Sequence, residues 1–293
     1  LVCALDGQVT DVIGSGQSGL EDGSYADAAF NDPQGMALDG ETLYAADTKN
    51  HAVRRVDLDG RQVETVAGTG EQASMFHGGG PGPSSQLNSP WDLALHDGTA
   101  YIAMAGFHQL WRLDLDTMEV RPHAGSGRER IVDGPMDSAQ LAQPSGIVTD
   151  GIKLYFTDSE TSAVRTAGLD GQGSVSTIIG EDLFTFGDVD GTGNEVRLQH
   201  PLGIDILNGE LFVTDTYNNK VKRISPVSRE ATTFLGSGRA GHEDGAGRLA
   251  EFHEPGGLSV ADGKVYIADT NNHLVRVADI ESQRVTTLEL TGV

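Results

Sequence analysis

The hydrophobic residues of this chain come in short runs that recur at a fixed interval. Each unit opens with a proline, and the five prolines are 54 or 57 residues apart: Pro33, Pro90, Pro144, Pro201 and Pro255. Fourteen positions after each of them stand, in order, Asp47, Met104, Asp158, Asp215 and Asp269. A constant period of this kind is the signature of a repeat architecture.

Each unit contains four short runs that predict β-strands. In the first unit an apolar run follows Pro33, a second run occupies 43–47, and an alternating run covers 53–57. A fourth run rich in Thr and Val ends at a Gly-Thr-Gly or Gly-Ser-Gly sequence. Such runs, separated by Gly, Asn and Asp, are typical of an antiparallel meander, and no window keeps a helical period. Repetition of the meander around an axis predicts an all-β propeller.

The units divide the chain into blades of one domain, residues 1–293. Five full blades are expected at about 30–70, 87–127, 141–180, 198–238 and 252–290. Residues 1–16 match only the third and fourth strands of a further unit. We therefore predict a six-bladed ring whose first blade is incomplete, its inner pair of strands lying upstream.

Charge narrows the range of partners. The net charge is −23, with 20 basic residues against 43 acidic ones. Sequence-independent binding of nucleic acid needs clustered Lys and Arg, and anionic membranes attract the same residues, so neither partner is expected. No apolar run is long enough for a membrane span. We expect a monomer in the cytoplasm, with a periplasmic or secreted location as the alternative.

The motifs carry a family resemblance. The pattern Pro-x-Gly, then Tyr-x-Ala-Asp-Thr-x-Asn-His and a basic residue, resembles the NHL repeat, with its letters at Asn50-His51 and Asn272-His273. Unusual segments such as 89–92 and 183–191 extend the likeness to the thioredoxin-like/NHL family over nearly the whole chain. Two blades depart from it, with Thr161-Ser162 and Asn218-Asn219. The resemblance implies a thioredoxin-like domain fused upstream. The Cys-x-x-Cys motif of such a domain does not occur in residues 1–293, so the resemblance implies no redox activity for these residues.

Residues that repeat are expected to have structural roles, because a catalytic group is rarely needed five times. Asp and His side chains in these turns are expected to cap exposed backbone groups. This set comprises Asp47, Asp158, Asp215, Asp269, His51 and His273. Residues that break the pattern suit recognition at the mouth of the channel, and these are Trp91, Phe107, Glu160, His200 and Tyr217. Gln34 and Ser145, which stand beside the prolines on the same face, complete the set of candidate binding residues.

Metal binding is the main enzymatic alternative. Some NHL propellers are lyases with zinc on channel histidines, and His51, His108 and His273 occupy equivalent places in three blades. Zinc needs ligand atoms at about 2.0–2.1 Å, which three separate blades do not readily supply. Asp188 and Asp190 faintly resemble a calcium loop but lack its full set of ligands. We expect no cofactor, with zinc or calcium as the alternative.

Three functions remain open from the sequence. The first is a non-catalytic platform that binds a protein or peptide partner within a thioredoxin-like/NHL protein. The second is a metal-dependent lyase or hydrolase with its site in the axial channel. The third is a rigid structural spacer. No Gly-x-Ser-x-Gly sequence marks a nucleophile, so a serine hydrolase is not indicated.

Overall fold

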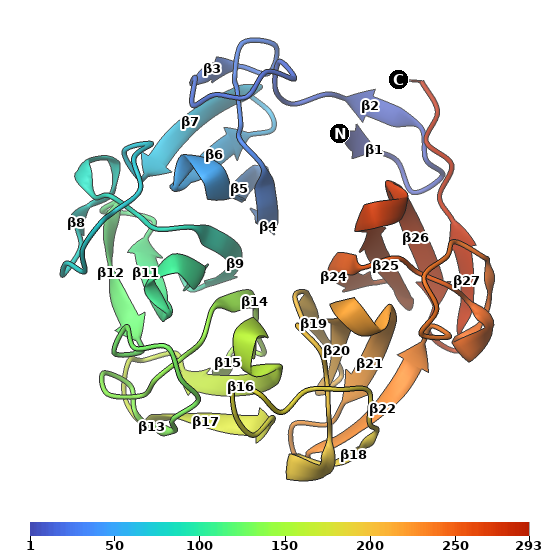
Figure 1. Cartoon of the computed structure of the whole chain (residues 1–293). Coiled ribbons are helices and arrows are strands. Elements are labelled where there is room, and N and C mark those ends of the chain that lie inside the picture. Colours follow the sequence, from blue (N-terminus) through green and yellow to red (C-terminus); the bar gives the residue numbers. More distant parts are fainter. Residues whose placement is uncertain (293) are drawn as a thin grey trace.

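The computed structural model describes residues 1–292 and shows a β-propeller. Five antiparallel sheets of five strands each surround a central channel (Figure 1). Blade 1 contains β3 (Gly23–Ser24), β4 (Pro33–Asp39), β5 (Thr42–Asp47), β6 (Ala52–Asp57) and β7 (Gln62–Ala67). Blade 2 contains β8 (Gly80–Pro81), β9 (Pro90–His96), β10 (Thr99–Met104), β11 (Gln109–Asp114) and β12 (Glu119–Ala124).

The remaining three blades repeat this order. Blade 3 contains β13 (Gly134–Pro135), β14 (Pro144–Thr149), β15 (Lys153–Asp158), β16 (Ala163–Gly168) and β17 (Ser174–Ile179). Blade 4 contains β18 (Gly191–Thr192), β19 (Ile204–Leu207), β20 (Glu210–Asp215), β21 (Lys220–Ile224) and β22 (Glu230–Leu235). Blade 5 contains β23 (Gly245–Ala246), β24 (Pro255–Ala261), β25 (Lys264–Asp269), β26 (Leu274–Asp279) and β27 (Arg284–Thr287).

The prediction of six blades with an incomplete first blade is wrong. β1 (Val2–Cys3) and β2 (Val9–Asp11) pair only with each other and lie in the gap between blades 1 and 5 (Figure 1). Two strands this short carry no inner pair on which a blade could be built. The hairpin is instead tied to the other end of the chain, where Val9 N donates to Thr291 O at 2.8 Å and Thr291 N to Gly7 O at 3.0 Å.

Each blade also has a fifth strand that the repeat pattern did not predict. This two-residue strand precedes the inner strand in the sequence and pairs with the outermost strand, as β3 does with β7. Pairs of residues are too short to leave a period of two in the sequence, so no pattern announces them. They cover part of an edge that would otherwise be open to other chains.

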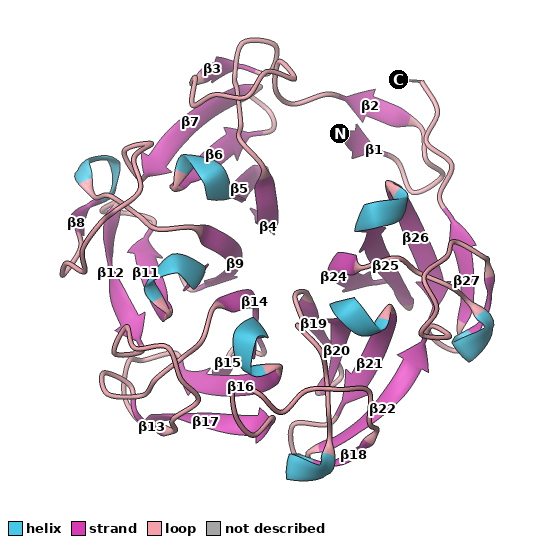
Figure 2. Ribbon diagram, viewed as in Figure 1, coloured by secondary structure: helices cyan, strands magenta, loops and turns pink. Residues whose placement is uncertain are grey.

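Short 3₁₀ turns connect the strands. The turns η1 (Thr48–Asn50), η3 (Ala105–Phe107), η4 (Ser159–Thr161), η6 (Thr216–Asn218) and η8 (Thr270–Asn272) join the second and third main strands of the blades. The turns η2 (Gly82–Ser84), η5 (Gly193–Glu195) and η7 (Gly247–Leu249) follow the short outer strands. Figure 2 shows the first group around the channel on the face in view. No helix among residues 1–292 is long and apolar enough to cross a membrane.

The core lies between blades and not within one central cluster. Ile102 and Trp111 of blade 2 pack with Tyr44 and Val53 of blade 1, and similar clusters fill the next three interfaces. The face of blade 1 that is not packed against blade 2 remains more open. On this face Met36 and Leu38 of β4 are 63% and 61% exposed. Sheet-on-sheet packing therefore holds the blades in order and leaves their inner strands along the channel.

Candidate binding site at the channel

The spacing of fourteen residues between proline and aspartate has a direct structural cause. Pro33 lies opposite Asp47 in the β4–β5 register, and Asp47 Oδ1 accepts a hydrogen bond from Asn31 N at 2.7 Å. The same bond forms at Asp158, Asp215 and Asp269, each to the amide two residues before its proline. In four of the five blades the repeated aspartate thus fixes the backbone just before the inner strand.

Each of these aspartates also has a basic partner in its own blade. Asp47, Asp158 and Asp269 are fully buried and pair with Arg54, Arg165 and Arg276 at 2.8, 2.8 and 2.9 Å. In blade 4 the cation is Lys222, at 3.8 Å from Asp215. Burying a carboxylate is costly unless it is paired and hydrogen-bonded, and all four have both kinds of partner. At Asp215, whose lysine is the most distant of the four cations, burial outweighs these contacts and raises the pKa to about 7.

Blade 2 replaces this polar arrangement with an apolar one. Met104 stands at the aspartate position, Trp111 at the arginine position and Phe107 where blade 1 has Asn50. The rings of Phe107 and Trp111 stack with centroids 5.3 Å apart. Phe107 is only 2% exposed. This residue, expected at the channel mouth, therefore packs inside the blade and is not available to a partner.

The histidines of the repeat join neighbouring blades. His51 Nδ1 accepts a hydrogen bond from Ser89 N at 3.0 Å, and His108 Nδ1 accepts one from Gln143 N at 3.2 Å. Ser162 Oγ and Asn219 Oδ1 do the same in the next two interfaces. Burial lowers the pKa of His51, which keeps the ring neutral and able to accept. At the equivalent place in blade 5, His273 is exposed beside the gap.

The metal candidates do not converge. Within residues 1–292, no three His, Cys, Asp or Glu side chains lie close enough together to hold a metal ion. Asp188 and Asp190 instead accept from Lys222 Nζ, both at 2.8 Å, and Arg248 adds a third contact at 2.8 Å to Asp190. Burial would raise the pKa of Asp190, but Lys222 and Thr233 outweigh it and lower that pKa to about 2.

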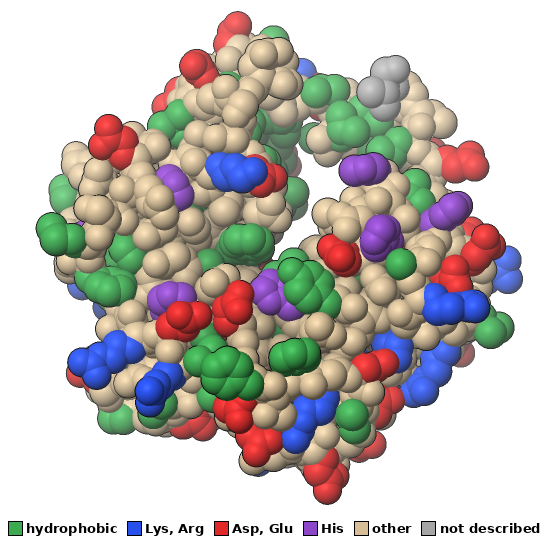
Figure 3. Space-filling model, in the orientation of Figure 1, with side chains coloured by type: hydrophobic (Ala, Val, Ile, Leu, Met, Phe, Trp, Pro, Cys, Tyr) green, Lys and Arg blue, Asp and Glu red, His purple; other side chains and the backbone are tan. Residues whose placement is uncertain are grey.

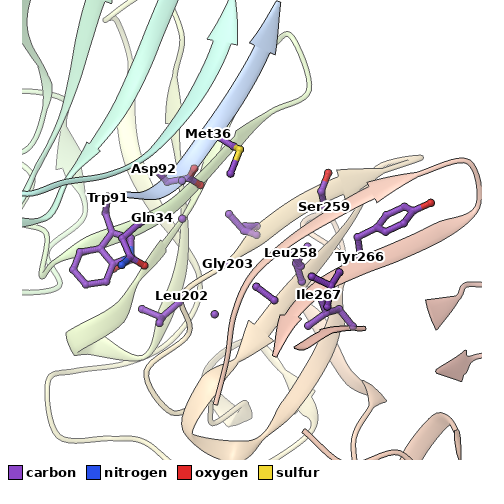
Figure 4. Close-up of a pocket in the computed structure, with 18 residues that line it drawn as sticks. Gln34, Met36, Trp91, Asp92, Leu202, Gly203, Leu258, Ser259, Tyr266 and Ile267 are labelled. Atoms are coloured by element: carbon purple, nitrogen blue, oxygen red, sulfur yellow. The ribbon is translucent and has the colours of Figure 1, made fainter. Parts of the chain in front are cut away.

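The inner strands line a pocket of about 350 Å³ that runs along the channel and beside blade 5 (Figure 4). Its lining includes Gln34, Trp91 and Ser145, three residues that the sequence nominated. Leu202, Leu258 and Ile267 provide apolar walls across the opening. A largely apolar cavity with a few polar groups is the usual form of a ligand site.

Asp92 is a charged residue of this pocket that the sequence analysis did not propose as a site residue. In four blades a glycine stands at the third position of the Pro-x-Gly motif, whereas blade 2 has Asp92. The neighbouring blade accommodates it, because a Cβ on Gly35 would lie 2.0 Å from Asp92 Oδ1. Asp92 Oδ2 accepts from Ile147 N at 2.9 Å. Burial raises the pKa of Asp92 to about 7, and the charge of Asp205 adds to the effect.

Three more nominated residues gather at the mouth. The rings of His200 and Tyr217 stack with centroids 4.7 Å apart and planes 8° apart. Glu160 Oε1 lies 4.0 Å from His200 Nδ1, and Tyr217 is 49% exposed. Burial lowers the pKa of His200, although the carboxylates of Glu160 and Glu254 oppose the shift. Figure 3 shows acidic, histidine and hydrophobic side chains bordering the opening.

Comparison with solved structures shows the fold alone. A nidogen/laminin complex covers 90% of this chain and 82% of the matched chain, with a TM-score of 0.64 and 17% identity. A streptogramin B lyase structure covers 90% and 70%, with a TM-score of 0.56 and 14% identity.

Sequence comparisons are more specific. The model of the NHL repeat matches residues 252–278. NHL repeat-containing protein 2 of Homo sapiens is 37% identical over 99% of this chain and 44% of its own length. Protein SUPPRESSOR OF QUENCHING 1, chloroplastic, of Arabidopsis thaliana is 42% identical over 97% of this chain and 29% of its own length. The chain thus spans less than half of these relatives, and within that span it is an NHL-repeat β-propeller closely similar to NHL repeat-containing protein 2.

Proposed function

We propose that this propeller is a non-catalytic platform that binds a peptide segment of a partner protein at the mouth of its channel. The observation that carries the proposal is that six of the candidate binding residues lie together at the channel. Gln34, Trp91 and Ser145 line one pocket, and Glu160, His200 and Tyr217 form a cluster beside it. Exposed aromatic side chains next to apolar walls and a few polar groups are typical of recognition surfaces.

The proposal also includes the larger protein in which the propeller acts. Since the relatives are more than twice as long as this chain, we place the propeller in a larger thioredoxin-like/NHL protein, where it holds a partner near the fused domain. The cytoplasmic location stays a prediction, and one relative bears the name chloroplastic.

The test is a selection of peptides from a random heptapeptide library on the wild-type propeller. Counter-selection uses the double variant Trp91→Ala/Tyr217→Ala, which removes the two aromatic faces of the site. A matched control, Phe184→Ala/Phe186→Ala, removes two exposed aromatic residues outside the pocket. We expect peptides that bind the wild type and the control but lose at least about tenfold in affinity for the channel variant, equal to about 1.4 kcal/mol.

Two results would overturn the platform. Peptides that bind all three proteins equally would place binding elsewhere on the surface. A library that yields no binder to the wild type would favour the rigid spacer. Zinc or calcium retained in stoichiometric amount after dialysis against a chelator would instead favour the metal-dependent alternative.

A further inference from the structure

The channel carboxyl of Asp92 differs from the repeated buried aspartates in one respect. Those four have an arginine or a lysine of the same blade as partner. Asp92 and Asp205, within the described chain, are held only by backbone amides and a serine hydroxyl. Within residues 1–292 the four repeated aspartates, which end the second main strands, have basic partners, whereas Asp92 and Asp205 on the inner strands have none.

The surroundings of Asp92 determine which kind of ligand could form an ion pair with its carboxylate. It lies one residue beyond Trp91 on β9 and lines the pocket, with Leu202 and Leu258 opposite (Figure 4). Gly35 of β4 and Ile147 of β14 are its close neighbours, and neither titrates. A group that fits must therefore offer a positive charge to the carboxylate and an aliphatic stem to the walls.

Charge around the entrance favours the same group. Glu160 and Glu254 flank the stacked rings of His200 and Tyr217, and an aromatic face attracts a cation as a carboxylate does. The net charge of −23 raises the local concentration of cations over the whole surface.

We propose that the channel pocket binds a guanidinium or ammonium group on an aliphatic stem, with the Asp92 carboxylate as its counter-ion. The source is an arginine or lysine side chain of a peptide, or a free amine of the same shape. The proposal rests on the function proposed above in one respect, which is that the channel mouth admits a peptide.

Binding of the cation is linked to a proton. The pKa of Asp92 is about 7 in the free protein, so this carboxyl is about half protonated at neutral pH. The titratable neighbour whose charge acts on it is Asp205 on β19, whose own pKa is raised by burial. A cationic ligand requires the ionised form, so its apparent affinity rises by about tenfold between pH 6 and pH 8.

The experiment uses the indole N–H signals of the two tryptophans in NMR spectra. Trp91 lines the pocket, whereas Trp111 is fully buried in blade 2 and serves as an internal reference. The probes are N-acetyl-arginine N-methylamide, its neutral citrulline analogue and agmatine. We expect the arginine probe to shift the Trp91 signal, the citrulline probe to bind at least about tenfold more weakly, and Trp111 to stay in place.

Variants separate the counter-ion from general charge. Asp92→Asn keeps an oxygen for Ile147 N and removes the charge, and we expect it to weaken the arginine probe at least about tenfold and abolish the pH dependence. Asp97→Asn removes the same charge from an exposed turn of blade 2 and is expected to change nothing. Tighter binding of the arginine probe than of agmatine assigns the cation to a peptide, and the reverse order assigns it to a free amine.

Equal binding of the arginine and citrulline probes would contradict the role of Asp92 as the counter-ion. Full affinity of the arginine probe for Asp92→Asn would contradict it as well. So would a wild-type protein that binds neither arginine nor agmatine. The platform itself fails by a different result, in which library peptides ignore the loss of Trp91 and Tyr217. A peptide that needs those two aromatic residues but tolerates Asp92→Asn would sustain the platform and refute the cation site.

Discussion

At the scale of single residues, the blades show two solutions to one buried position. Four blades bury an aspartate with a basic partner, and blade 2 buries Met104 and Trp111 instead. Both arrangements are stable because the two residues of the pair differ together from one blade to another. A buried pair exchanged as a set for apolar residues is often neutral or stabilising, while loss of one partner leaves an uncompensated charge.

Arg165→Met should therefore be strongly destabilising. It leaves Asp158 buried without its cation, and we expect a loss of about 3–5 kcal/mol in the free energy of unfolding, measured by urea denaturation. Arg239→Met is the control, since Arg239 is 81% exposed and such pairs contribute about 1 kcal/mol or less. The double variant Asp158→Met/Arg165→Met should recover part of the loss. A double variant no better than Arg165→Met would contradict this account.

Asp92→Asn should change how stability depends on pH. The folded pKa of about 7 lies above that of the unfolded chain, so the folded state holds its proton more tightly and loses stability as pH rises from about 4 to about 7. An asparagine carries no such penalty. At pH 8 we expect the variant to be more stable than the wild type by about 2–4 kcal/mol, with a smaller difference at pH 4. Thermal unfolding at both pH values checks this, and an equal difference at both would refute it.

At the scale of elements, four interfaces between blades share one repeated contact, in which a side chain accepts a hydrogen bond from a backbone amide of the next blade. His51, His108, Ser162 and Asn219 each accept from the amide that precedes the next proline. The side chains differ in shape, but each presents a lone pair to that amide at 2.8 to 3.2 Å. The histidine of the motif is therefore a hydrogen-bond acceptor here, which explains why serine or asparagine can stand in its place.

This equivalence can be tested at His51. His51→Asn should keep the bond to Ser89 N and stay within about 0.5 kcal/mol of the wild type, whereas His51→Ala leaves that amide without its partner and should cost about 1–3 kcal/mol. The exposed His242 provides the control, as His242→Ala should have no effect on urea denaturation. Equal losses in the alanine and asparagine variants would show that packing of the ring, and not its acceptor, matters.

Most of the strands could be predicted from the sequence. The four main strands of a blade follow from runs of apolar residues and from turn residues, because both reflect local geometry. The burial of Phe107 could not be predicted, because it depends on Met104 and Trp111 both being apolar. The role of Asp92 was visible only as a missing glycine, and its burial arises from blades 1 and 3.

At the scale of the whole molecule, the ring contains five blades and a gap in which the β1–β2 hairpin lies (Figure 1). The count predicted from the sequence was wrong because a match to two strands does not tell whether they join a larger sheet. The hairpin is held by an ion pair between Asp11 and Arg61 of blade 1 and by two hydrogen bonds to Thr291 near the other end of the chain.

Gly7→Val should release that contact. Gly7 has a φ of +91°, and a Cβ there would lie 2.0 Å from Glu289 O. We expect the amides of Val9 and Thr291 to exchange with solvent at least about tenfold faster, while amides of β15 keep their protection. Gly40→Val is the control, with a φ of +57° and no atom within 4 Å of the added Cβ. Unchanged exchange at Thr291 in the Gly7 variant would contradict the docking.

The gap has a consequence for cooperativity. Blades 2, 3 and 4 each bury two interfaces, whereas blades 1 and 5 each bury one extensive apolar interface with another blade. Energetically the molecule is thus a linear array with two ends, in which stability is a sum of unit terms and nearest-neighbour couplings. Loss of structure can start at either terminal unit and spread inward, so the middle units should be the last to melt.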